Sequence, residues 1–317
     1  MADPGPAGRD DTPPGATQPT IGRLLGEATV SLRQSGSESA RLDAELLLGH
    51  VLGMGRAGVL AHPEIALSPG QAAAFESAVR RRAAGEPVAY IRGLKEFYGL
   101  AFAVDRRALI PRPETELLVG LAVERLREML TGRPRPAGAP TLQVWDVGTG
   151  SGAIAVSIAV ECRRRGYAAD LRLLATDVSP EALGLAVENA VAHGVADILD
   201  FAAGDLLDVD GPADRPATDL LVANLPYVPS AVVPELPVAA SFEPALALDG
   251  GPDGLASIRR LLDGLPAVLA AGGQALLEIG AGQEAALVDD AATRLPGWSV
   301  RLHADLAGLP RVAELSR

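Results

Sequence analysis

The sequence predicts a doubly wound, Rossmann-like α/β fold that follows a small helical domain. From Thr141 onward, short apolar runs typical of buried parallel strands alternate with segments of helical periodicity. Such alternation indicates a sheet that is covered by helices on both faces. Seven strands are expected, near residues 142–147, 171–176, 198–203, 218–223, 273–279, 297–303 and 311–315.

Three segments are expected before the domain that carries this sheet. Residues 1–20 are rich in Pro, Gly, Asp and Thr and lack the apolar run of a signal peptide, so they predict a disordered tail. Residues 21–85 predict a helical domain, and residues 86–112, with aromatic residues separated by glycines, predict a β-hairpin connector. Pro113 suits the first turn of a helix, so the sheet domain is expected over 113–317.

The helical domain is expected to contain three helices, over 21–33, 40–52 and 69–83. The residues predicted for the buried face of the second helix recur at helical spacing: Leu42, Leu46, Leu47 and Val51.

Composition excludes several classes of protein. No apolar stretch reaches about 18 residues, so no membrane span is expected. The net charge of −12, from 28 basic and 40 acidic residues, argues against a grip on a phosphate backbone. Cys162 is the single cysteine, which rules out an internal disulfide and a cysteine-based zinc site. No metal is expected, and a cytoplasmic location is the default.

A glycine-rich loop, Asp146 to Gly152, follows the first strand of the sheet. Glycines there let the backbone approach a ligand closely at the carboxyl edge. Asp177 ends the second strand, where a carboxylate can accept both hydroxyls of a ribose. Gly148, Gly150 and Ala153 also satisfy the loose dinucleotide fingerprint, so an NAD-dependent oxidoreductase is one interpretation. Asp146 disfavours it, because a negative charge beside the loop suits an ammonium or sulfonium group better than a pyrophosphate.

The next two strands also end in polar residues. Asp205, followed by Leu206, comes after the third strand and can accept from the amine of an adenine. The fourth strand ends in Asn224-Leu225-Pro226-Tyr227. The Asn224 oxygen and the Leu225 carbonyl can accept both N–H groups of a planar NH2. Pro226 biases Leu225 towards an extended backbone, and Tyr227 offers a flat face to an amide or a base.

Each acid alone also fits a strand-end turn or a helix cap, but together these residues form the ordered signature of an S-adenosylmethionine-dependent methyltransferase. The residues expected to hold the cofactor are Asp146, Gly148, Thr149, Gly150, Ser151, Gly152, Asp177, Asp205, Leu206 and Asn224.

From Ile21 to the C-terminus the chain resembles the release factor glutamine methyltransferase family, the PrmC/HemK type of protein-(glutamine-N(5)) methyltransferase. The segment Leu109-Ile110-Pro111-Arg112-Pro113-Glu114-Thr115-Glu116 is the most specific match. The other matching segments are Gly85 to Tyr90, Glu96 to Gly99, Asp146 to Gly152, Asn224 to Tyr227, Phe242 to Ala245 and Asp249 to Gly251. The resemblance implies methylation of the glutamine of the Gly-Gly-Gln motif in class 1 peptide chain release factors.

The resemblance also implies roles for individual residues. Asn224 to Tyr227 would hold the glutamine and form the catalytic motif, and the turn from Arg112 to Glu116 would close over the methionine end of the cofactor. Phe97 would line the pocket from the hairpin, with a place in the hairpin core as the alternative. Thr115 and Glu116 receive no chemical role. The family has proline where this chain has Leu225, a change that keeps the carbonyl but leaves the substrate class open.

An amide nitrogen is a poor nucleophile, and the sequence places no strong base beside the motif. The histidines, His50, His62, His193 and His303, lie away from it. Orientation and electrostatics are therefore the expected source of catalysis. An adenine N(6)-methyltransferase acting on RNA or DNA is the main alternative, because an adenine amine has the same planar geometry. Against it stand the acidic charge and the N-terminal helical segment with its hairpin, which favour the docking of a protein. A non-catalytic cofactor-binding module is a further alternative.

Overall fold

The computed structural model describes residues 18–131, 141–209 and 215–317. The chain divides into two compact units, of which the first ends at Arg92 and the second begins at Gly93. The disordered tail expected over residues 1–20 lies outside the described residues as far as residue 17. Among the helices that the structure describes, none combines the length and the apolar character needed to cross a bilayer.

The first unit is built from helices. The three helices expected there are present, as α1 (Ile21–Gln34), α2 (Ala40–Leu52) and α4 (Pro69–Ala83). Two short helices were not predicted, α3 (Arg56–Ala61) and α5 (Val88–Arg92).

Local capping explains where two of these helices begin. The Thr20 side chain accepts a hydrogen bond from the Arg23 N–H at the start of α1. Ser68 and Gln71 form a reciprocal capping box at the start of α4, with Pro69 in the first turn.

The predicted buried face of α2 is partly wrong. Leu42 is 41% exposed, whereas Ala44, Leu47 and Leu48 are fully buried. α2 contacts α1, α3, α4 and α5. Its buried face therefore contains alanines as well as leucines, and a search for large apolar residues alone does not find it.

The second unit begins with the expected β-hairpin. β1 (Leu94–Phe97) pairs antiparallel with β2 (Leu100–Ala103). Tyr98 and Gly99 connect them with φ angles of 50° and 68°, the left-handed conformation that a two-residue hairpin turn requires. The connector expected over 86–112 is thus divided, because α5 belongs to the helical unit.

The main sheet of the described residues has eight strands in the order β6-β5-β4-β3-β7-β8-β10-β9. The strands predicted from the sequence are all present, and β6 is an addition. Their bounds are β3 (Leu142–Val147), β4 (Leu171–Asp177), β5 (Leu199–Asp205), β6 (Asp208–Val209), β7 (Thr218–Ala223), β8 (Leu269–Glu278), β9 (Ser299–Ala304) and β10 (Pro310–Ser316).

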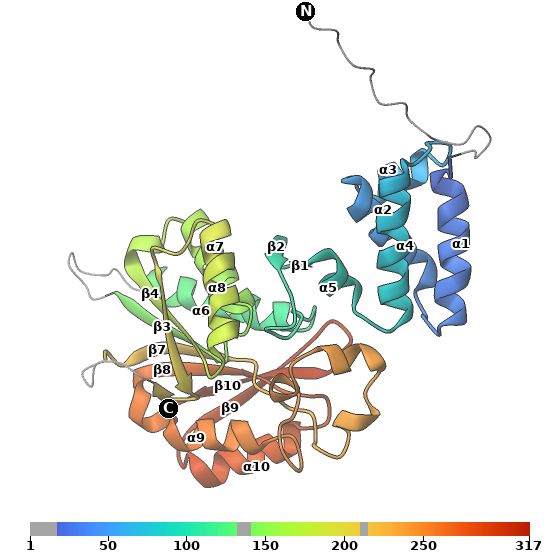
Figure 1. The fold of residues 1–317 in the computed structure, drawn as a ribbon. Coiled ribbons are helices and arrows are strands. Elements are labelled where there is room, and N and C mark those ends of the chain that lie inside the picture. Colours follow the sequence, from blue (N-terminus) through green and yellow to red (C-terminus); the bar gives the residue numbers. More distant parts are fainter. Residues whose placement is uncertain (1–17, 132–140, 210–214) are drawn as a thin grey trace, which may run out of the picture. The chain divides into compact units, whose positions relative to one another are not determined.

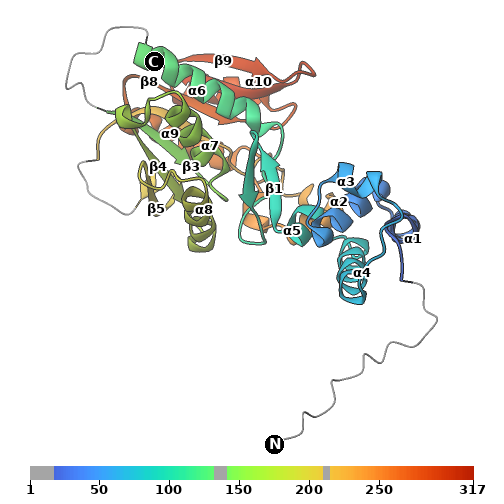
Figure 2. The same cartoon turned by 90° about the horizontal axis from the view of Figure 1, so that it is seen from above.

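Helices cover both faces of this sheet, as Figure 1 shows. α6 (Thr115–Thr131), α7 (Ala153–Arg164) and α8 (Pro180–Ala192) lie side by side on one face (Figure 2). α9 (Ala256–Val268) and α10 (Glu284–Arg294) cover the other face. The 3-10 turns are η1 (Ala168–Asp170), η2 (Val233–Glu235), η3 (Val238–Phe242) and η4 (Ala245–Ala247).

β8 begins four residues before the predicted start at residue 273 and contains Gly272 and Gly273. The register between β7 and β8 shifts there, between Thr218 and Leu220. A Cβ on Gly273 would lie 2.8 Å from the Thr218 carbonyl oxygen, so the bulge requires glycine.

The parallel strands place the predicted motifs at one edge. β5, β4, β3, β7 and β8 are neighbours and run in the same direction. Their carboxyl ends therefore meet, which is where ligands bind in doubly wound folds.

Candidate active site

A cavity of about 390 Å³ opens at this carboxyl edge, within the second unit. It lies between the ends of β3, β4, β5 and β7 and the segments around Pro111 and Pro244. The predicted site residues that line it are Gly148, Thr149, Gly150, Ser151, Asp177, Asp205, Leu206, Asn224, Leu225 and Pro226. Asp146, Gly152, Tyr227 and Phe97 do not line it.

The glycine loop folds over the end of β4. The N–H groups of Gly148 and Thr149 both donate to the Thr176 carbonyl at 2.8 Å, and the Gly150 N–H donates to Asp177 Oδ2 at 2.8 Å. Gly148 and Gly152 have φ angles of 74° and 79°. A Cβ on Gly152 would lie 3.0 Å from the Ala186 Cβ, so this glycine allows α7 to approach α8.

Asp146 lies beneath the loop, 1% exposed. Its Oδ2 accepts from the Thr149 hydroxyl at 2.7 Å and from the Ala155 N–H at 3.1 Å. Its Oδ1 is buried and has no hydrogen-bond partner among the described residues. Burial raises the pKa of Asp146 to about 7. The carboxyl group beneath the loop therefore has one oxygen that no hydrogen bond from the described part of the chain satisfies.

The other two acids differ in their surroundings. Asp177 Oδ1 accepts from the Ser179 N–H at 2.9 Å, and burial raises the pKa of Asp177 above its ordinary value. Asp205 is exposed, and its Oδ2 accepts from the Arg260 guanidinium at 2.7 Å. Arg260, which also lines the cavity, was not predicted from the sequence.

The tetrapeptide after β7 splits between the cavity and the protein interior. Asn224 lines the cavity, and its Nδ2 donates to Thr115 Oγ1 at 3.0 Å. The Leu225 side chain is 4% exposed and packs in the core beside Trp145 and Val147. A Cβ on Gly148 would lie 3.2 Å from Leu225 Cδ2, so this leucine lies directly over the glycine loop.

The backbone after Leu225 is held by a glycine-rich segment. A Cβ on Gly250 would lie 2.6 Å from the Pro226 carbonyl oxygen, so only glycine fits there. The Tyr227 carbonyl accepts from Gln283 Nε2 at 3.0 Å. Burial raises the pKa of the Tyr227 phenol, with a further increase from Glu278.

Phe97 is not brought to the cavity. It is 1% exposed, and its ring meets that of Phe102 edge-on with 6.0 Å between the centroids. Both rings belong to the hairpin, which corresponds to the hairpin-core alternative.

One wall of the cavity depends on Glu243, a buried residue that received no role from the sequence. Its Oε1 accepts from the Arg112 guanidinium at 2.6 Å, and its Oε2 accepts from the Ile110 N–H at 3.2 Å. These bonds join the turn around Pro111 to the segment that follows β7. The motif Phe242-Glu243-Pro244 was the one available signal.

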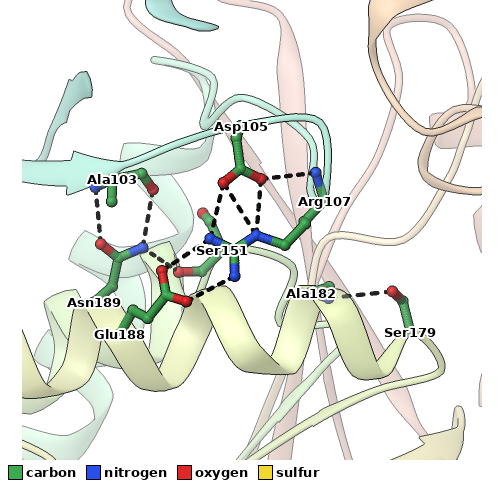
Figure 3. A network of polar contacts seen from close by, with 8 residues as sticks. All are labelled: Ala103, Asp105, Arg107, Ser151, Ser179, Ala182, Glu188 and Asn189. Carbon is green, nitrogen blue, oxygen red and sulfur yellow. Dashed lines mark hydrogen bonds and ion pairs between the residues drawn. The ribbon is translucent and has the colours of Figure 1, made fainter. Parts of the chain in front are cut away.

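A second network, drawn in Figure 3, ties the hairpin to the glycine loop through α8. Asn189 is 1% exposed; its Oδ1 accepts from the Ala103 N–H at 2.8 Å, and its Nδ2 donates to the Ser151 carbonyl at 2.9 Å. Arg107 bridges Asp105 and Glu188 in the same network, with contacts of 2.8 Å to each. No local sequence pattern marks Asn189, because its partners are distant in the chain.

Known proteins resemble this chain over most of its length. Residues 23–93 match the family model described as the PrmC N-terminal domain. A release factor glutamine methyltransferase of Moorella thermoacetica is 43% identical over 270 residues, 85% of this chain and 89% of that protein. One of Rhodopirellula baltica is 37% identical over 300 residues, 94% of this chain and 96% of that protein.

A solved structure described as the hMettl16 catalytic domain in complex with MAT2A 3'UTR hairpin 6 shares the fold, with a TM-score of 0.50. The two chains are 15% identical over 78% of this chain and 82% of that one. The identities of 43% and 37% to the two bacterial enzymes, each over more than four-fifths of both chains, show that this protein belongs to the release factor glutamine methyltransferase family.

Proposed function

We propose that this protein methylates the side-chain amide nitrogen of the glutamine in the Gly-Gly-Gln motif of class 1 peptide chain release factors, with S-adenosylmethionine as the methyl donor. The proposal depends chiefly on one cavity, which is lined by Gly148 to Ser151 of the glycine loop, by Asp177 and by Asn224-Leu225-Pro226. The names of the bacterial relatives support glutamine as the acceptor.

The donors and acceptors around the cavity suit S-adenosylmethionine. Asp177 would accept from the ribose hydroxyls, and Asp205 would accept from the adenine amine through the oxygen that Arg260 does not bind. Asp146 does not line the cavity, but its negative charge beneath the glycine loop would favour an ammonium group above the loop. This set of acids does not suit a pyrophosphate, which argues against an NAD-dependent oxidoreductase.

Asn224 and Leu225 would orient the substrate. The Asn224 oxygen accepts one N–H of the glutamine amide, and the Leu225 carbonyl accepts the other. Two acceptors in fixed positions aim the nitrogen lone pair along one direction, which lowers the entropic part of the barrier. They also stabilise the positive charge that develops on the nitrogen during the transfer.

When bound, S-adenosylmethionine supplies an electrophilic methyl group: the N–C bond forms as the C–S bond breaks, and its electron pair stays on sulfur. The nitrogen keeps one of its two original protons, and the other leaves to solvent. Asn224 and Leu225 remain chemically unchanged, and the product keeps one N–H for one of the two acceptors. The buried leucine side chain lies against Gly148 on one side of the cavity.

The main rival is an adenine N(6)-methyltransferase. The net charge of −12 disfavours nucleic acid, because binding to phosphates comes largely from basic residues. The likeness to the hMettl16 domain concerns the fold alone.

The helical unit has a separate part in this proposal. Its match to a PrmC N-terminal domain supports a role in docking the release factor. Release factors work on ribosomes, so the protein would act in the cytoplasm.

Transfer of a labelled methyl group tests the proposal. Incubation with labelled S-adenosylmethionine should label a class 1 release factor and leave its Gly-Gly-Gln glutamine-to-alanine variant unlabelled. A matched incubation with RNA and DNA tests for adenine N(6)-methylation. Label in nucleic acid, or equal label in both release factors, would exclude the proposed substrate.

A further inference from the structure

Glu278 is a buried acid that has no place in the mechanism above. It is the last residue of β8 and is 2% exposed. Its Oε2 is buried without a hydrogen-bond partner among the described residues. It does not line the cavity. Burial of a carboxylate oxygen without a hydrogen-bond donor costs free energy, so the groups around Glu278 decide whether it stays charged.

The strand register brings Glu278 next to Asn224. β7 and β8 are parallel, with Ala223 paired to Leu277. The residues that follow this pair, Asn224 and Glu278, therefore leave the sheet side by side at its carboxyl edge. Thr115 and Asn224 lie near the Glu278 carboxyl and favour its charged form, which opposes the effect of burial on its pKa.

Thr115 is the third member of this group of side chains. It is the first residue of α6, 4% exposed, and its Oγ1 accepts from Asn224 Nδ2 at 3.0 Å. The sequence assigned no chemistry to Thr115. In the structure it is the residue that links the end of β7 to the start of α6.

The chemistry of the three groups fixes the direction in which hydrogen bonds among them can run. A carboxylate can only accept, and a threonine hydroxyl has one proton to donate. If that proton points to Glu278, Thr115 Oγ1 can only accept from Asn224. Asn224 must then turn its NH2 end towards Thr115 and Glu278, which leaves its oxygen for the cavity. The opposite orientation would present an NH2 group to a substrate NH2 group.

We propose that Glu278 is a positioning residue, which acts directly and through Thr115 to hold the Asn224 amide with its oxygen towards the substrate. The inference rests on the proposed function, because only an N–H donor in the substrate needs that oxygen. Glu278 itself touches neither substrate nor reacting atoms.

Protonation of Glu278 would remove this control. Burial raises the pKa of Glu278 to about 7, with Glu114 raising it further and Arg311 lowering it. Glu114 lies in the segment before α6, and Arg311 lies in β10. The charge of Glu278 in turn raises the pKa of Tyr227, which follows β7. A protonated carboxyl can donate to Thr115, and Thr115 can then donate to Asn224 in the wrong orientation. Turnover should therefore fall as the pH drops below about 7.

The chain offers a test that needs no turnover, because it contains only two asparagines, Asn189 and Asn224. Selective 15N-asparagine labelling thus gives two side-chain amide signals. We expect the Asn224 signal to shift with a midpoint at about pH 7 in the wild type and to stay constant in Glu278→Gln. Asn189, which bonds to Ala103 and Ser151, is the internal control and should not move.

Kinetics provide the second readout. Glutamine at position 278 can donate as well as accept, so it no longer fixes the orientation. Glu278→Gln should lower kcat roughly 10- to 100-fold, the range expected for a lost hydrogen bond to a charged group. Cofactor affinity should stay within about twofold. Thr115→Val should lower kcat less, because Glu278 would still act directly on Asn224, and Thr115→Ser should recover most of that loss.

The outcomes separate this inference from the proposed function. An Asn224 signal that ignores pH, or that titrates equally in Glu278→Gln, overturns the positioning role. A Glu278→Gln variant that keeps the wild-type kcat, with the same fall in turnover at acid pH, also overturns the positioning role. If the wild type transfers no methyl group to a release factor while Asn224 titrates as expected, the proposed function fails and the coupling of the three side chains stands.

Discussion

Replacement of Asp146 by asparagine should stabilise the protein at alkaline pH while it weakens cofactor binding. The carboxylate is fully buried, and one of its oxygens has no partner in the described residues. Burial raises the pKa from its ordinary 3.8 to about 7, so the folded protein binds this proton more tightly than the unfolded chain does. The wild type therefore loses stability as the pH rises from about 4 to about 7.

The size of the effect follows from the shift of about three pKa units, at 1.36 kcal/mol for each. The fully charged carboxylate lowers the free energy of unfolding by about 4 kcal/mol. About 2 kcal/mol of this decrease takes place between about pH 5.5 and about pH 8.5. Asparagine keeps the acceptor for Thr149 and Ala155 but buries an NH2 group without an acceptor, at a cost of roughly 1–3 kcal/mol. That cost does not depend on pH, so it cancels when the two pH values are compared.

Urea unfolding of the cofactor-free protein measures this difference. Asp146→Asn should gain about 2 kcal/mol relative to the wild type between about pH 5.5 and about pH 8.5. The matched control is Asp205→Asn at the same edge of the sheet. Asp205 is exposed and ion-paired, so its replacement should change stability by less than about 1 kcal/mol at either pH. Calorimetry at the higher pH should show cofactor affinity lowered roughly tenfold in Asp146→Asn, because the negative charge beside the glycine loop is lost. If the difference in unfolding free energy between Asp146→Asn and the wild type is the same at both pH values, the pKa of Asp146 is not raised by burial.

Three further predictions concern the cavity. Asn224→Ala should lower kcat roughly 100- to 1,000-fold with cofactor affinity nearly intact, as steady-state kinetics and calorimetry would show; a variant that keeps most of its rate contradicts the clamp. Asp177→Ala should weaken cofactor affinity roughly 10- to 100-fold, because charged hydrogen bonds to the ribose are lost, and an unchanged dissociation constant removes Asp177 from the ribose site. Leu225→Pro should keep turnover, since the carbonyl remains, but should lower the free energy of unfolding by about 1–3 kcal/mol because buried methyl groups above Gly148 are lost. Loss of turnover in a folded Leu225→Pro protein would show that the leucine itself is required.

The strands and the polar residues at their ends could be predicted because their signals are local. A parallel strand that is buried on both faces has a continuous apolar sequence, such as Leu220 to Ala223. The residue that follows this sequence lies at the carboxyl edge of the sheet. Asp177 and Asn224 could therefore be assigned to one edge without knowledge of the packing. The bulge in β8 was missed, since Gly272 and Gly273 resemble a turn until the neighbouring Thr218 carbonyl is in place.

The supporting residues could not be predicted, because their partners are far away in the chain. Asn189 bonds to Ala103, 86 residues earlier, and Arg112 bonds to Glu243, 131 residues later. Asn224 and Thr115 are 109 residues apart. A buried polar side chain carries no periodic pattern of its own, so its role becomes visible only when the sheet register is known. Phe97 illustrates the converse, because an aromatic residue in a hairpin fits a pocket and a hydrophobic core equally well.

The position of the transferred methyl group shows whether Asn224 directs methylation to the glutamine amide. A class 1 release factor should be incubated with S-adenosylmethionine and either the wild-type protein or Asn224→Ala, digested, and mapped by tandem mass spectrometry. We expect one added methyl group on the side-chain amide of the Gly-Gly-Gln glutamine with the wild type, and almost none with Asn224→Ala. A methyl group on any other residue, or equal methylation by both proteins, would contradict this expectation.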